Sequence, residues 1–198
     1  LIEEVKSITG DSMSGSQLSW VFEVIEEFIE SYCPDEQLRK NILNHLFNKL
    51  KKFSKWMTET QNIFTKKIAL ELGIQFETEN LTKNHFDTKT DWNRLSGNRI
   101  SIYTLTEKAG KNAKAILEEL IDNADVIINS DVDGNQTLKS LAKNSNIFVI
   151  TWLSAKHAAT EFIRQNKGSD CEIIYSPGKG SSSIVSAIES HINSSNYH

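Results

Sequence analysis

A short segment near the carboxyl end of the chain, SPGKGSSS, combines glycines, a lysine and hydroxyls between a predicted strand and a predicted helix. Glycine loops and the first turns of helices expose main-chain N–H groups that bind phosphate and other anions. The alternative is a tight turn followed by an N-cap, which uses the same residue types without a ligand. The candidate ligand-binding residues in this segment are Gly178, Lys179, Gly180, Ser181, Ser182 and Ser183.

A second polar group follows the most apolar predicted strand and consists of Ser154, Lys156 and His157. We predict that Ser154 caps the next helix and that His157 lies in its first turn, where the helix dipole disfavours a protonated imidazole. A neutral His157 can accept a proton or bind a ligand. Alternatively, it is a partly buried side chain with one hydrogen bond. With the SPGKGSSS segment, this group would complete an anion pocket.

Two acidic residues, Asp131 and Asp133, stand before Gly134 in the segment DVDG. Carboxylates with this spacing suit Mg²⁺, and His157 would then act as a general base in hydrolysis. Acids before a glycine are more commonly part of a turn. The spacing also resembles the start of a calcium loop, but the twelfth position holds Ala142 and no glutamate, so calcium is excluded.

Lysines and aromatic residues cluster in the segment NKLKKFSKW of the first half of the chain. Lysines on one surface contact nucleic-acid phosphates. A solvated basic face on an amphipathic helix is the commoner explanation of such a cluster. The candidates for nucleic-acid contact are Lys49, Lys51, Lys52 and Lys55.

Three motifs of known chemistry are missing from the sequence. The segment TLTEKAGKNA contains only Gly110, whereas a dinucleotide-binding fingerprint needs three glycines. Lys179 is followed by glycine, whereas a Walker A lysine is followed by Ser or Thr. No G-x-S-x-G nucleophile elbow is present. The sequence therefore assigns no cofactor, no resident metal and no nucleophile.

Alternating strands and helices must position the candidate groups of the second half. The predicted strands are RISIYTL, DVIIN, IFVITWL and CEIIYS, and a helical segment follows each of them. This alternation predicts an α/β fold, a small doubly wound, Rossmann-like parallel sheet with helices on both faces. Ligands of such sheets bind at the carboxyl edge. We therefore expect the polar groups that follow the strands to share this edge.

The first half of the chain is predicted to be all helical. Apolar residues recur three and four positions apart between Ser16 and Gly73, with Pro34 separating the first two helices and Gly73 closing the last. We divide the chain into a helical region with its connector, residues 1–95, and a Rossmann-like α/β domain, residues 96–198. The helical region suits a protein partner or self-association.

Composition and charge exclude several classes of protein. The chain of 198 residues has a net charge of −4, which excludes a surface that is basic throughout. Cys33 and Cys171 lie far apart and form no metal-ligand pair. Two thiols do not make a disulfide framework, so we predict a reducing, cytoplasmic location. No apolar run is long enough to span a membrane. The first residue is not Met, and we expect the chain to be part of a longer protein.

Two short motifs lie on either side of the fourth predicted strand. Ser154, His157 and Ala159 match a Ser-x-x-His-x-Ala helix start, and the GSS of the SPGKGSSS segment matches a Gly-Ser loop before a last helix. In these motifs, residues 99–190 resemble bacterial Rossmann-like domains of unknown function. Such domains often form the carboxyl-terminal parts of larger proteins, some of them encoded near antiphage defence genes. The resemblance implies a module of a defence system and no particular reaction.

Two functional hypotheses of different class follow from these residues. The first is a non-catalytic binding and assembly module that holds an anionic ligand, a nucleotide or a nucleic-acid phosphate, at the carboxyl edge of the sheet. The second is a metal-assisted phosphoester or nucleotide hydrolase that uses Asp131, Asp133 and His157. The missing nucleophile, metal set and cofactor fingerprint favour the first hypothesis.

Overall fold

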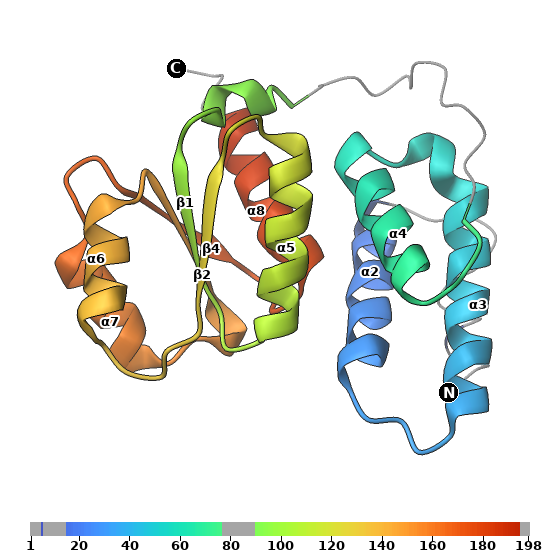
Figure 1. Cartoon of the computed structure of the whole chain (residues 1–198). Helices are drawn as coiled ribbons and strands as arrows, with labels where there is room; N and C mark the ends of the chain where they lie inside the picture. The colour runs from blue at the N-terminus through green and yellow to red at the C-terminus, as the bar shows by residue number, and fades with distance from the viewer. Residues whose placement is uncertain (1–4, 6–14, 77–89, 195–198) are drawn as a thin grey trace. The chain divides into compact units, whose positions relative to one another are not determined.

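The computed structural model of the chain describes residue 5, residues 15–76 and residues 90–194. The chain divides into two units, Leu1–Thr88 and Lys89–His198. The first unit is helical and the second contains a sheet flanked by helices (Figure 1). Most of the predicted connector, residues 77–89, lies outside the described residues.

Helices of the first unit begin and end at capping residues. The described elements are α2 (Gly15–Glu30), α3 (Glu36–Phe53), the 3-10 turn η1 (Ser54–Trp56) and α4 (Glu59–Glu71). The side chain of Asp35 accepts a hydrogen bond from the N–H of Leu38 at 2.8 Å and so caps α3. Thr58 and Gln61 form a capping box at the start of α4. Gly73 follows α4 with a φ of +66°, a conformation that glycine adopts without strain.

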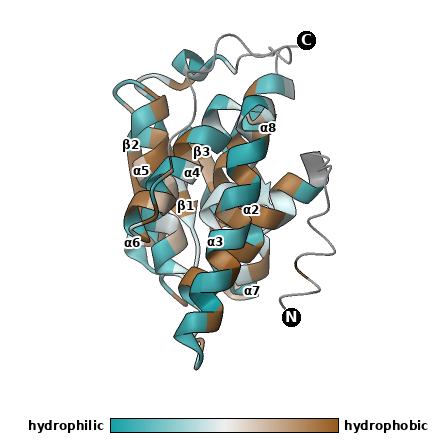
Figure 2. Ribbon diagram, turned by 90° about the vertical axis from the view of Figure 1, so that its right-hand side faces the viewer, coloured by the Kyte–Doolittle hydropathy of each residue, from teal (hydrophilic) through white to brown (hydrophobic). Residues whose placement is uncertain are grey.

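The apolar stripes of these helices form the core of the first unit. Val21 and Ile25 of α2 are buried with Leu46 of α3, and the rings of Phe22 and Phe64 meet edge to face at 5.0 Å. The helices show alternating hydrophilic and hydrophobic bands (Figure 2), as amphipathic segments must. Among the described residues, no helix is both long and apolar enough to cross a bilayer.

The second unit is built on a parallel sheet, as the sequence predicts. Its strands are β1 (Arg99–Tyr103), β2 (Asp125–Asn129), β3 (Ile147–Thr151) and β4 (Glu172–Ser176), in the order β2-β1-β3-β4. All three neighbouring pairs are parallel. The other elements are η2 (Trp92–Leu95), α5 (Glu107–Leu120), α6 (Gln136–Asn144), η3 (Trp152–Ser154), α7 (His157–Asn166) and α8 (Ser181–Ser194).

Helices cover both faces of the sheet, so the fold is doubly wound. α6 and α7 pack together on one face, and α5 and α8 pack together on the other (Figure 1). In the sheet, β2 lies on one side of β1, and β3, which follows β2 in the chain, lies on the other side of β1. The strand order therefore reverses between β1 and β3, which is the point where open parallel sheets bind ligands.

The segment before β1 belongs to the sheet unit through its hydrogen bonds to α8. The hydroxyl of Thr90 donates to the carboxylate of Glu189 at 3.2 Å, and Arg94 Nη1 donates to the carbonyl oxygen of Ile192 at 3.1 Å. Trp92 and Leu95, both in η2, are buried. Residues 90–95, which we placed in the connector from their polar sequence, are thus held against α8.

Candidate anion site at the carboxyl edge of the sheet

The candidate groups that follow the strands share one edge of the sheet. Because the strands are parallel, the loops after β1, β2, β3 and β4 all leave the same edge, which lies at the bottom of the unit in Figure 1. His157, which follows β3, and Lys179, which follows β4, therefore both lie beyond this edge. α7 and α8 nevertheless cover opposite faces. The structure thus separates the predicted pocket into a part on the α7 face and a part that leads to α8.

Three hydroxyls fill the point where the strand order reverses. Ser154 Oγ lies 2.7 Å from Thr151 Oγ1 and 3.0 Å from Thr104 Oγ1. The Thr151 hydroxyl donates to the carbonyl oxygen of Tyr103 at 3.1 Å, and the N–H of Leu105 donates to the carbonyl oxygen of Ser154 at 3.2 Å. Ser154 therefore joins the loops after β1 and β3, and a ligand would lie outside this closed junction.

The helix after β3 begins later than we predicted. Its N-cap is Lys156, and Ser154 belongs to the 3-10 turn η3, so the expectation that Ser154 caps the helix is wrong. The reason is that the Ser154 hydroxyl is already bonded to the two threonines. Lys156 provides no side-chain hydrogen bond to the first turn of α7, and Lys156, His157 and Ala158 are not buried.

The open first turn of α7 has the properties of an anion site. The first N–H groups of a helix have no partner within it, and the dipole adds positive potential. His157 is exposed, so the alternative of a partly buried histidine is wrong. The ammonium group of Lys156 adds a full positive charge beside this turn.

A buried tyrosine that the sequence patterns did not single out lies under the same turn. Tyr103, the last residue of β1, has 0% exposure, and its hydroxyl has no hydrogen-bond partner. The main-chain nitrogen of Lys156 approaches this hydroxyl without the geometry of a hydrogen bond. A buried polar group without a partner costs free energy, so this hydroxyl is suited to bond an oxygen of a ligand.

The surroundings of Tyr103 keep its phenol protonated. Burial raises the pKa of the phenol above its ordinary value, and the main chain of Lys156 partly opposes this rise. The negative charges of Asp131 and Asp133 raise the pKa further. A protonated phenol is a hydrogen-bond donor, so Tyr103 can offer its proton to an oxygen of a ligand.

The acidic loop after β2 is held by its own asparagines. The carboxylate of Asp131 accepts hydrogen bonds from Asn129 Nδ2 at 2.6 Å and from Asn135 Nδ2 at 2.8 Å, and these bonds lower the pKa of Asp131. Asn135 also caps α6 by accepting from the N–H of Leu138 at 2.8 Å. Within the described parts of the chain, no group of three acidic, histidine or cysteine side chains could hold a metal. The hydrogen bonds of the Asp131 carboxylate therefore stabilise the turn between β2 and α6.

The SPGKGSSS loop also forms hydrogen bonds within itself. The N–H of Gly178 donates to Ser183 Oγ at 2.8 Å, and the Ser176 hydroxyl donates to the carbonyl oxygen of Gly178 at 2.9 Å. Gly178, Gly180, Ser181 and Ser183 are buried, Ser182 is half-buried and Lys179 is exposed. The Gly178 N–H, which we considered for an anion, is thus already occupied. These bonds favour the interpretation of a turn and cap.

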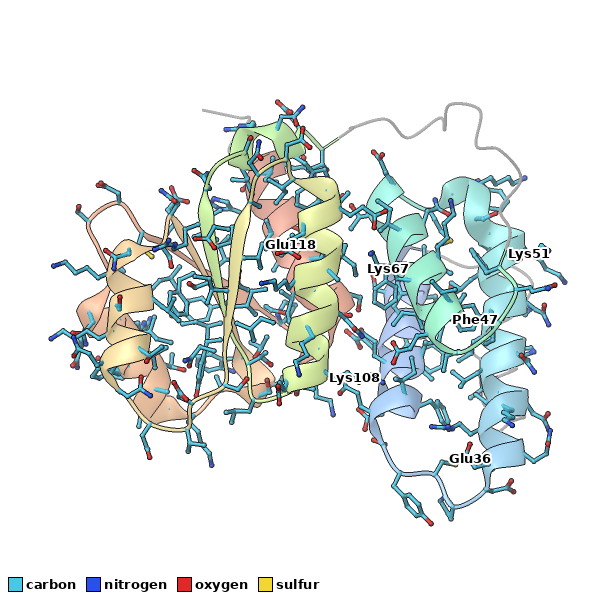
Figure 3. The ribbon with its side chains drawn as sticks, in the orientation of Figure 1. Glu36, Phe47, Lys51, Lys67, Lys108 and Glu118 are labelled. Atoms are coloured by element: carbon cyan, nitrogen blue, oxygen red, sulfur yellow. The ribbon has the colours of Figure 1, made fainter. Side chains whose placement is uncertain are left out.

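The lysine cluster of the first unit lies at the carboxyl end of α3. Lys51 and Lys52 occupy the last turn. Figure 3 shows Lys51 at the opposite end of α3 from Glu36. The carboxyl end of a helix carries the negative end of the helix dipole, which stabilises cations there and disfavours a phosphate. Lys55 Nζ lies 4.0 Å from the centroid of the Trp56 ring. These positions give the cluster a structural explanation.

The fold and its edge define the class of protein as a doubly wound α/β unit preceded by a helical unit. A family model described as DpdD-like matches residues 1–187, and the chain belongs to this family. The family is associated with defence, in agreement with the resemblance seen in the sequence. Neither the curated proteins nor the solved structures compared with the chain gave a match.

Proposed function

We propose that the α/β unit is a non-catalytic module of a defence system that binds a phosphate group of a nucleotide or nucleic acid at the start of α7. The observation that supports this proposal is the buried Tyr103 hydroxyl without a partner, beside a helix start that lacks a side-chain cap. One ligand oxygen would satisfy both features. The helical unit would serve a protein partner or self-association.

The acidic residues nearby favour a ligand of low charge. Asp131 and Asp133 are close enough to the Tyr103 phenol to affect its pKa. Their carboxylates would repel a polyphosphate more strongly than a phosphodiester with a single negative charge. A nucleic-acid phosphodiester therefore suits the site better than a nucleoside triphosphate.

The test is binding of a fluorescein-labelled thymidine oligonucleotide to the wild-type chain and to Tyr103→Phe. The substitution removes a donor to a charged group and is expected to weaken binding about tenfold. It should leave the free energy of unfolding unchanged or raised, because the hydroxyl has no partner to lose. Tyr32→Phe, at a side chain with 91% exposure in the first unit, is the matched control.

Two results would overturn the proposal. One is a wild-type chain that binds neither the oligonucleotide, nor thymidine monophosphate, nor inorganic phosphate. The other is an affinity that Tyr103→Phe leaves unchanged. A Mg²⁺-dependent release of phosphate that disappears in Asp131→Ala would instead support the hydrolase hypothesis.

A further inference from the structure

Two aromatic side chains remain exposed where β3 and β4 end. Trp152 has 60% exposure and Tyr175 has 37%, and their ring centroids lie 6.0 Å apart in an edge-to-face arrangement. Trp152 opens η3, in the same loop that leads to Lys156 and α7. Rings of this size are usually buried, so a surface pair of them indicates a binding surface.

The alternation of side chains along β4 places Tyr175 on the α7 face. Its neighbours in β4, Ile174 and Ser176, are buried, whereas Ile173, two residues before it, packs against the core cluster beneath α6 and α7. Side chains alternate between faces along a strand, so Tyr175 shares the face of Ile173. The guanidinium of Arg164 in α7 lies 5.8 Å from the Tyr175 ring centroid, which agrees with this placement.

Positive groups accompany the aromatic pair. Lys156 precedes α7, and the guanidinium of Arg164 in α7 lies over Tyr175. An exposed ring next to cations and a helix N-terminus provides a flat apolar surface beside sites for negative charge. This is the combination found where proteins bind single strands, because a base stacks on the ring while its phosphate meets the positive groups.

We propose that Trp152 and Tyr175 stack on an unpaired base of a single-stranded nucleic acid whose phosphodiester lies at the first turn of α7. This inference rests on the proposed function and adds the class of ligand to it. A duplex keeps its bases stacked and paired, so it cannot present a base face to Trp152. A free nucleotide has the same base and phosphate, and the experiment separates it from a strand.

The experiment compares Trp152→Leu with the wild-type chain by fluorescence anisotropy. The probes are a labelled thymidine oligonucleotide, an oligonucleotide of the same length with abasic sites, a labelled duplex, and unlabelled thymidine monophosphate as competitor. Trp152→Leu is expected to weaken binding of the thymidine strand about tenfold and to leave the abasic strand unaffected. Tyr175→Leu should act in the same direction.

The chain offers a matched control in the first unit. Trp56 is 51% exposed, and a lysine lies over its ring. It is therefore also an exposed aromatic side chain with a cation beside it. Trp56→Leu should not change binding of the thymidine strand. Far-ultraviolet circular dichroism and thermal unfolding of all three variants verify the fold.

The outcomes separate this inference from the proposed function. Failure of the wild type to bind any phosphate probe would overturn both. Equal affinity for the thymidine and abasic strands would overturn only the stacking. If thymidine monophosphate competes as strongly as the unlabelled thymidine strand, the site binds a nucleotide, and the single-strand inference is overturned. Concentration-dependent self-association that is lost in Trp152→Leu, without base-dependent binding, would assign the exposed rings to a protein interface and overturn the inference.

Discussion

The main-chain N–H of Gly178 donates a hydrogen bond to the hydroxyl oxygen of Ser183 at 2.8 Å, and both residues are buried. This bond closes the loop between β4 and α8. It explains how a glycine- and serine-rich segment forms a helix start without a ligand. The N–H that a phosphate would need is satisfied by a side chain five residues later.

The first prediction concerns this closure. Ser183→Ala leaves the buried N–H of Gly178 without an acceptor and should lower the free energy of unfolding by about 1–3 kcal/mol. Ser186→Ala, at an exposed position of the same helix, is the control and should change it by less than about 0.5 kcal/mol. Urea unfolding measures both. Equal stability of Ser183→Ala and the control would contradict the role given to this bond.

The second prediction concerns the packing of the β2–α6 loop against α7. A Cβ atom at Gly134 would lie 2.5 Å from ring carbons of Phe162, closer than atoms can pack. Gly134→Ala should therefore lower the free energy of unfolding by about 1–3 kcal/mol. In Phe162→Ala the added methyl group has room, so the double variant should lose less than the sum of the two single losses, by at least about 0.5 kcal/mol. Additive losses would show that the loop does not rest on this ring.

The sequence predicts most of this fold because its strands are short and rich in apolar residues. DVIIN corresponds to β2 in full, and alternation with helices is enough to predict a parallel sheet. IFVITWL, in contrast, extends beyond β3, which ends at Thr151. Trp152 and Leu153 continue the apolar run but are exposed. Hydrophobicity alone cannot show whether another element covers a residue.

The site is harder to predict than the fold because its decisive groups depend on partners distant in sequence. Ser154 is a good N-cap by type, but Thr104, fifty residues earlier, competes for its hydroxyl. Tyr103 ends an otherwise ordinary strand, and only the packing of α7 shows that its hydroxyl lacks a partner. A tyrosine at the end of a buried strand, where the carboxyl edge begins, was the available signal.

The third prediction concerns the charge of Asp131. The hydrogen bond from Asn129, and then that from Asn135, lowers the pKa of this carboxyl below its ordinary value. The stabilisation from ionised Asp131 is therefore present above the ordinary pKa of an aspartate, about 3.9, and is lost as the pH falls through the lower pKa of the folded state. Carboxyl-carbon NMR should show a low pKa in the wild type and a higher one in Asn129→Ala. An unchanged Asp131 titration would contradict the assignment.

The last prediction separates the two interpretations of the lysine cluster in the first unit. Lys51 and Lys52 lie in the last turn of α3, where their charges complement the helix dipole. Lys51→Ala/Lys52→Ala should then lower the free energy of unfolding by about 0.5–1 kcal/mol, with the loss shrinking as salt is added. Lys40→Ala, at an exposed position nearer the start of the same helix, should show no such loss.

If the cluster instead binds nucleic acid, the same double variant should reduce the slope of log affinity against log salt by about two, because two fewer phosphates would be neutralised. Lys156→Ala, at the start of α7, provides the comparison, and we expect it to reduce the slope by about one. Because a phosphate at the carboxyl end of α3 would face the negative end of the dipole, we expect the slope of the Lys51→Ala/Lys52→Ala variant to equal that of the wild type. A reduced slope in that variant would instead place a second nucleic-acid interface on the helical unit.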